Sequence, residues 1–248
     1  MSKVFYKLGK KVGPGFRKAK WIWETATNSP AEALKVEYEV GRDMAYDVRH
    51  RFGLASDPQT KRVLDEVGCR LADCVGSKLR TFRFESIKDC PVQAFCLPGG
   101  FVFVSQSLVQ SCRSDKDEVA FVLGHEMAHV IRGHVMERMI SNSAIAAASR
   151  AAAIRSALTA SLRKFGIKLL QSAYSQSQEL EADMLAVRLL TTAGYDPHGS
   201  IRFLSRMAKS TDKPALGDYF NSHPQCEVRI EKISRFLEEN ESSHSETA

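Results

Sequence analysis

Residues 121–134 of the 248-residue chain read FVLGHEMAHVIRGH, and this stretch decides the fold. Apolar residues occupy nearly every direction around it, which is typical of a helix that is buried on all sides. Asp115 precedes the stretch and is a residue type that caps helix N-termini. We therefore predict a substantially buried helix, in which the polar side chains of His125, Glu126 and His129 need partners.

The spacing of these three residues is that of a metal site. His125 and His129 are four apart and project from one helix face, with Cβ atoms roughly 5–6 Å apart. Two imidazoles so placed can bind one Zn²⁺ ion at about 2.0–2.1 Å each. Glu126 points about 100° away around the helix, so it can lie beside the open coordination position as a general base. Because H-E-x-x-H also arises by chance, the interpretation requires a further ligand.

A third ligand is expected because a catalytic zinc ion usually takes three protein ligands and a water. The stretch SQELEADMLAV, 177–187, offers three carboxylates, although such a run taken alone is more often a solvated helix face. Glu179 and Asp183 are four apart and share a face, whereas Glu181 lies about 200° from Glu179 and is expected to face water. One of the shared pair can bind zinc and the other can accept the free N–H of a ligand histidine.

The remaining pattern predicts an α+β fold that is mostly helical and zincin-like, with a small antiparallel sheet preceding the H-E-x-x-H helix. Apolar periodicity, helix caps and proline or glycine boundaries predict further helices at 29–52, 57–78, 166–193, 197–209 and 224–239. Alternating or continuous apolar runs around the turn Pro98-Gly99-Gly100 predict strands at 81–87, 92–97 and 101–104.

The positive charge of the chain is concentrated at its N-terminus. The net charge is +6, from 35 basic and 29 acidic residues, but residues 1–23 contain seven of the basic residues and no acidic one. The remainder therefore has 28 basic and 29 acidic residues, which argues against a groove for nucleic acid. Aromatic residues are interleaved with these lysines, so the segment is interpreted as a peripheral membrane contact, a targeting presequence or a solvated extension.

No secretory signal and no spanning helix is visible in the sequence. The alanine-rich segment 141–162 is interrupted by Arg150 and Arg155, and we interpret it as a helical flap, with in-plane membrane contact as the alternative. Six cysteines without a C-x-x-C pair indicate reduced thiols and no zinc ribbon. The localisation stays unknown; an intracellular protein is expected, with membrane association left open.

The two motifs together resemble the HtpX/CAAX-prenyl-protease family of gluzincin metalloendopeptidases, whose pattern is H-E-x-x-H followed by E-x-x-x-D. HEMAH is followed 54 residues later by ELEAD, and the resemblance extends over about residues 33–238. Four further stretches resemble family elements: AFCLPGGFVFVSQSLV, DEVAFVLGHEMAHV, AGYDP and SHPQCEVRI. Because no spanning helix is visible, the chain resembles the single-domain branch of the family, which includes periplasmic quality-control peptidases and the soluble core of the stress-activated mitochondrial inner-membrane protease. It does not resemble the multi-span prenyl-protein branch.

The resemblance implies a role for each residue of the two motifs. His125, His129 and Glu179 would bind one Zn²⁺ ion per chain. Glu126 would be the catalytic base, and Asp183 would hold a ligand histidine from behind. The choice of Glu179 over Asp183 as the ligand comes from the family pattern, in which the ligand stands four residues before the aspartate.

The resemblance also singles out a late histidine. His223 matches it and would lie near the fourth coordination position, either as a hydrogen-bond donor to the transition state or as a reversible plug on the metal. A loop histidine without function is the alternative. The other histidines match no family element, and we expect surface or packing roles for His50, His134, His198 and His244.

On this resemblance, the chain is expected to be a zinc-dependent metalloendopeptidase that cleaves unfolded or damaged proteins. Its partners would be protein or peptide substrates, and its oligomeric state is left open. The chain would divide into a basic aromatic extension, 1–28, a zinc metallopeptidase domain, 29–239, and a disordered tail, 240–248. The alternative is a latent or non-catalytic peptidase-fold protein that holds client proteins at a membrane surface.

Overall fold

The computed structural model of the protein describes residues 29–76, 80–88, 93–112, 115–141, 173–209, 223 and 226–245. Three segments with sequence-based predictions lie outside these residues: the extension 1–28, the alanine-rich segment from residue 142 onward, and the loop 210–222. Among the described helices, none combines the length and the apolar character that crossing a membrane requires. The five described cysteines are free thiols.

The first two helices begin where the sequence predicts. They are α2 (Pro30–Phe52) and α3 (Pro58–Asp73), and each opens with a proline and a side-chain cap. Ser29 and Asp57 accept hydrogen bonds from the backbone N–H three residues further on, at 3.2 and 2.9 Å. Helix α3 is shorter than the predicted 57–78: it ends at Asp73, and the backbone N–H of Cys74 caps it by donating to the carbonyl oxygens of Leu71 and Ala72.

The sheet has three strands: β1 (Arg83–Ile87), β2 (Ala94–Leu97) and β3 (Phe101–Ser105). Their spatial order is β1-β3-β2, with β2 antiparallel to β3 and β1 parallel to it. The prediction of an antiparallel sheet is therefore wrong for one of its two pairings. The cause is the strand order: β3 lies between β1 and β2, and because the chain reverses direction from β1 to β2 and again from β2 to β3, β1 and β3 run the same way.

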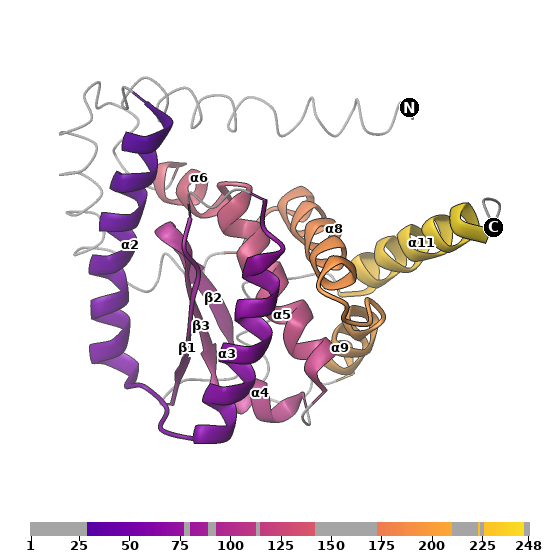
Figure 1. Ribbon diagram of the computed structural model, residues 1–248, viewed down its shortest axis with the longest axis horizontal. Coiled ribbons are helices and arrows are strands. Elements are labelled where there is room, and N and C mark those ends of the chain that lie inside the picture. The colour runs from indigo at the N-terminus through magenta and orange to yellow at the C-terminus, as the bar shows by residue number, and fades with distance from the viewer. Residues whose placement is uncertain are drawn as a thin grey trace.

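The motif helix α5 (Lys116–Ile131) lies at the centre of the molecule. The Asp115 carboxylate caps it by accepting two backbone N–H groups at 3.0 and 3.2 Å, and every residue from Glu118 to Val130 is buried. Helix α5 packs against β2 on one side and against α8 (Gln176–Thr192) and α9 (Gly199–Ala208) on the other (Figure 1). The prediction of a buried helix is confirmed.

The remaining helices differ from the prediction at their ends. A capping box between Ser175 and Gln178 starts α8 ten residues later than the predicted 166. Helix α11 (Cys226–Ser245) continues past the predicted end at 239, so most of the expected disordered tail is helical. Two short helices, α4 (Gln106–Ser111) and α6 (His134–Ser141), were not predicted.

The turn between β2 and β3 rests directly on α2. This turn is η1 (Pro98–Gly100), and Gly99 within it has φ 76°, a conformation that favours glycine. On α2, a Cβ added to Gly41 would lie only 1.7 Å from the Pro98 carbonyl oxygen. The absence of a side chain at Gly41 therefore lets the β2–β3 hairpin seat against α2.

We predict that Gly41→Ala destabilises the protein by about 1–3 kcal/mol, because the added methyl group forces α2 and the turn apart. This loss would outweigh the roughly 1 kcal/mol that alanine gains over glycine in a helix. Urea denaturation followed by circular dichroism measures the change. Gly76→Ala is the matched control, because its added Cβ meets no atom within 4 Å. Equal stability of the two variants would contradict the close packing.

Candidate metal centre

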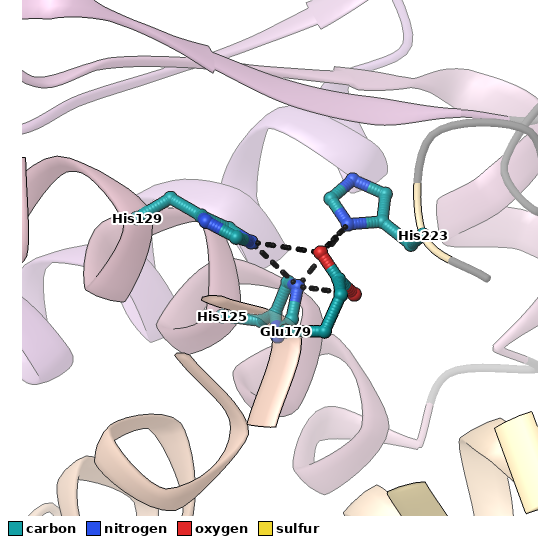
Figure 2. Close-up of side chains that lie close together, drawn as sticks. All are labelled: His125, His129, Glu179 and His223. Carbon is teal, nitrogen blue, oxygen red and sulfur yellow. Dashed lines mark hydrogen bonds and ion pairs between the residues drawn. The ribbon is translucent and has the colours of Figure 1, made fainter. Parts of the chain in front are cut away.

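Three histidines and one glutamate converge in the interior of the protein. His125 and His129 come from α5, Glu179 comes from α8, and His223 lies three residues before α11 (Figure 2). All four side chains are at most 1% exposed. One ligand atom of each lies within 4.8 Å of the others, so these atoms surround a common point.

The distances between these atoms fit a tetrahedral zinc ion. Atoms about 2.0–2.1 Å from such an ion lie about 3.3 Å from one another. The Nε2 atoms of His125 and His129 are 3.0 Å apart, and each lies 3.5 and 3.3 Å, respectively, from a carboxylate oxygen of Glu179. His223 Nδ1 lies 3.2 Å from His125 Nε2 and 3.1 Å from Glu179 Oε1. Imidazole nitrogen and carboxylate oxygen are also ligands that zinc prefers.

The surroundings of the two α5 histidines, His125 and His129, shift their pKa values in opposite directions. Burial and the Arg229 charge oppose protonation of His125, but Glu179 and Asp183 outweigh them and raise the pKa of His125 to about 9. Burial dominates at His129 and lowers its pKa well below the usual value. Burial acts to raise the pKa of Glu179, yet the cationic groups around it hold that pKa well below its usual range. Without metal, a proton on His125 therefore balances part of the buried negative charge.

The second carboxylate of α8 lies behind the metal site. Asp183 Oδ1 is 2.9 Å from His125 Nδ1, so the opposite nitrogen of His125 is directed to the centre. Arg229 of α11 donates two hydrogen bonds to Asp183, at 2.8 and 2.7 Å, and its Nη1 lies 3.0 Å from Glu179 Oε2. One buried guanidinium thus holds both carboxylates. Arg229 was not among the predicted site residues, although it stands in the SHPQCEVRI stretch.

Glu126 lies at the edge of the site, next to His223. Both of its oxygens are buried, and neither accepts a hydrogen bond in the described part of the chain. His223 Nε2 is 3.3 Å from Glu126 Oε1. Burial and the Glu126 charge raise the pKa of the Cys96 thiol well above its usual value, so this neighbour stays neutral. A carboxylate with free lone pairs beside a metal site is what a general base requires.

Two further residues pack against His129, and a third packs against one of them; no functional role was predicted for any of the three. The Tyr174 ring stacks on the His129 ring with centroids 3.8 Å apart, and the Arg138 guanidinium lies 4.0 Å from the Tyr174 centroid. His134, expected to have a surface or packing role, has its Nδ1 3.0 Å from His129 Nδ1. These residues hold the ring of His129 from two directions.

Comparison with known proteins places the chain in a family. A family model described as peptidase family M48 matches residues 58–237. The chain belongs to peptidase family M48. The matched range contains both motifs as well as His223 and Arg229, and the family predicted from those motifs is confirmed. Membership of this metallopeptidase family implies a metal, and the four converging side chains could hold one.

Relatives within family M48 carry names of metallopeptidases and proteases. The chain is 29% identical over 213 residues to the mitochondrial metalloendopeptidase OMA1 of Schizosaccharomyces pombe, covering 84% of this chain and 63% of that protein. It is 28% identical over 231 residues to a putative beta-barrel assembly-enhancing protease of Vibrio cholerae, covering 83% and 47%. It is 33% identical over 147 residues to the metalloprotease LoiP of Escherichia coli, covering 57% of each. The chain thus spans about half to just under two thirds of these relatives.

We predict that zinc binding to the metal-free protein releases about one proton at pH 7.5, because a ligand imidazole must be neutral and His125 has a pKa of about 9. Proton release should fall to about half at pH 9, and zinc affinity should rise as pH increases toward that value. Calorimetric titration in phosphate and in Tris measures the released proton through the difference in buffer ionisation enthalpy. Identical heats in the two buffers at pH 7.5 would contradict the prediction.

Proposed function

We propose that this chain is a zinc-dependent metalloendopeptidase that hydrolyses peptide bonds in unfolded or damaged proteins. The observation that carries the proposal is the buried carboxylate of Glu126, which accepts no hydrogen bond within the described residues, beside three side chains whose ligand atoms fit a zinc ion. Membership of family M48 supports the same reaction class. The relatives' names support a proteolytic role, and the substrate class is our own inference.

Each residue of the site has a distinct task in this reaction. His125, His129 and Glu179 would hold the zinc ion. A zinc ion in such a site lowers the pKa of a bound water toward about 7 and polarises the scissile carbonyl. Glu126 takes the proton of the attacking water and returns it to the leaving amine. Asp183 orients His125 and keeps its coordinating nitrogen directed at the centre.

The sheet suggests how a substrate is held. Strand β2 is an edge strand that packs against α5, and in the described part of the chain no strand pairs with its outer side. An extended peptide can pair with such an edge through main-chain hydrogen bonds. This binding mode recognises the main chain of the substrate and not a specific sequence motif. It requires a substrate segment that is already unfolded or loosened.

The position of His223 favours a latent form of the enzyme. Its Nδ1 would be a fourth protein ligand, and four protein ligands are the pattern of structural zinc sites, whereas catalytic sites keep one position open for water. We therefore propose that His223 plugs the metal in this conformation and leaves it for turnover. This proposal joins the catalytic interpretation with the latent alternative drawn from the sequence.

We further propose that the basic aromatic extension 1–28 is separate from the peptidase domain that begins at residue 29. Peripheral membrane contact through residues 1–23 is the role that its lysines and aromatic residues favour. The S. pombe relative is named as mitochondrial. A membrane-associated location for this chain is a proposal consistent with that name.

We predict that Glu126→Gln lowers casein hydrolysis by about 10²–10⁴-fold while zinc content stays near one per chain, because the amide cannot accept the proton of the attacking water. Fluorescent casein and metal analysis provide the two readouts. The comparison is repeated in the His223→Ala background, so that latency does not mask the loss. Glu231→Gln is the matched control, since Glu231 pairs with Arg235 on the surface. Normal proteolysis by Glu126→Gln would remove this residue from the mechanism.

We predict that His223→Ala increases casein hydrolysis severalfold without loss of zinc, because three protein ligands remain and the fourth position opens to water. A chelator should abolish the activity, and added zinc should restore it. Reduced hydrolysis with full zinc content would instead assign His223 as a hydrogen-bond donor to the transition state.

A further inference from the structure

One buried histidine takes no part in the reaction described above. His134 is the first residue of α6 and is 1% exposed. Its Nδ1 lies 3.0 Å from Nδ1 of His129, one of the proposed zinc ligands. At this distance the two nitrogens share one hydrogen bond, so one of them carries the proton and the other accepts it. Which nitrogen carries the proton decides whether His129 can bind a metal.

The other nitrogen of His134 faces a carboxylate. His134 Nε2 lies 3.5 Å from Glu181 Oε2, an ion-pair distance that is longer than the usual length of a hydrogen bond, about 2.7–3.2 Å. The Glu181 side chain is 48% exposed, and Arg132 Nε lies 3.2 Å from its other oxygen. A carboxylate paired with a guanidinium is ionised and can only accept hydrogen bonds. Glu181 therefore favours a proton on Nε2 of His134.

The direction of the hydrogen bond between His134 and His129 then follows. With its proton on Nε2, neutral His134 has a lone pair on Nδ1 and accepts from His129. His129 must carry its own proton on Nδ1, which leaves its Nε2 lone pair free. That Nε2 is the atom directed at the metal centre, 3.3 Å from Glu179 Oε1. The opposite direction would place a proton on Nε2 of His129 and block coordination.

We propose that Glu181 and His134 are positioning residues that fix the tautomer of His129 and so raise the metal affinity of the site. Neither residue touches the metal. The inference rests on the proposed function, because it requires His129 to be a metal ligand. It corrects the expectation that Glu181 only faces water and that His134 only packs.

The proposal gives each carboxylate of the acidic run a separate task. Glu179 lies among the ligand atoms, and Asp183 orients His125 by direct contact at 2.9 Å. Glu181 orients His129 through His134, because it projects from a different face of α8 and cannot reach His129 itself. The two ligand histidines are thus oriented in different ways. A buried carboxylate, Asp183, contacts His125 directly, whereas His129 is oriented through His134 by the partly exposed Glu181.

The test measures zinc affinity by competition with a chromophoric chelator and uses no activity assay. Removal of a partner that orients a ligand histidine typically weakens metal binding by about 10–100-fold. We expect a loss of this size for His134→Phe, which fills similar space but has no acceptor. His134→Gln should restore most of the affinity, because its amide oxygen can accept from His129. A purely structural role for His134 would not distinguish the two variants in this way.

A charge reversal at the surface tests the direction of the chain. Glu181→Lys offers a donor to His134 Nε2 and should reverse the hydrogen bond between His134 and His129, whereas Glu181→Gln keeps an acceptor. We expect Glu181→Lys to weaken zinc binding by about 10–100-fold and Glu181→Gln by only a few fold. Nitrogen-15 NMR of the metal-free protein should show His129 protonated on Nδ1 in the wild type and on Nε2 in Glu181→Lys. Glu231→Lys controls for the change in net charge.

The outcomes separate the inference from the proposed function. If the wild type binds zinc, and His134→Phe and Glu181→Lys bind it within twofold of the wild type, the inference is overturned and the proposed function stands. If the wild type itself binds no zinc, the proposed function fails and the inference fails with it. The inference would also be overturned if His129 had the same tautomer in Glu181→Lys as in the wild type. This result would count even if poor folding of the variant had lowered its zinc affinity.

Discussion

Buried charge between α5 and α8 is the constraint on which the rest of the structure depends. Three carboxylates, those of Glu126, Glu179 and Asp183, are at most 1% exposed, and the buried Arg229 supplies one compensating charge. Counted as ionised, these groups leave two negative charges, which one divalent cation would cancel. Buried charges are tolerated only when they are paired. The apolar helices, the central strand and the short turns all serve to hold this polar centre away from water.

Local features of this arrangement could be predicted from the sequence, and non-local ones could not. The start of α5 follows from Asp115 and its position in the chain, and the sharing of a face by Glu179 and Asp183 follows from helical spacing. The start of α8 was also readable, because Ser175 and Gln178 have the spacing of a capping box. The place of β3 between β1 and β2 was not, because it depends on which strands meet in space, and the alternation of residues along a single strand does not specify its neighbours.

The same distinction explains which site residues were found. His125, Glu126 and His129 form one motif on one helix, whereas Arg229 reaches the site from α11 and the carboxylates that it holds, those of Asp183 and Glu179, stand on α8. Glu181 is a clearer case still. Its direction around α8 was predicted correctly, yet its partner His134 is carried back onto α5 by a turn at Gly133, which has φ 76°. Helical spacing predicts the direction of each side chain on one helix, but it does not predict which residues of a neighbouring turn will contact that side chain.

His223 and Arg229 lie on different parts of the chain, so a movement of His223 that opens the metal site need not disturb the ion pairs of Arg229. Arg229 belongs to α11, which packs against α8 and α9, and its hydrogen bonds hold the carboxylate of Asp183. His223 lies outside any helix, and its link to Arg229 is a 3.5 Å contact through its carbonyl oxygen. The proposed departure of the His223 imidazole from the metal would therefore not require the guanidinium to move. An enzyme built in this way would expose its metal to water without giving up the ion pairs between Arg229 and the two carboxylates.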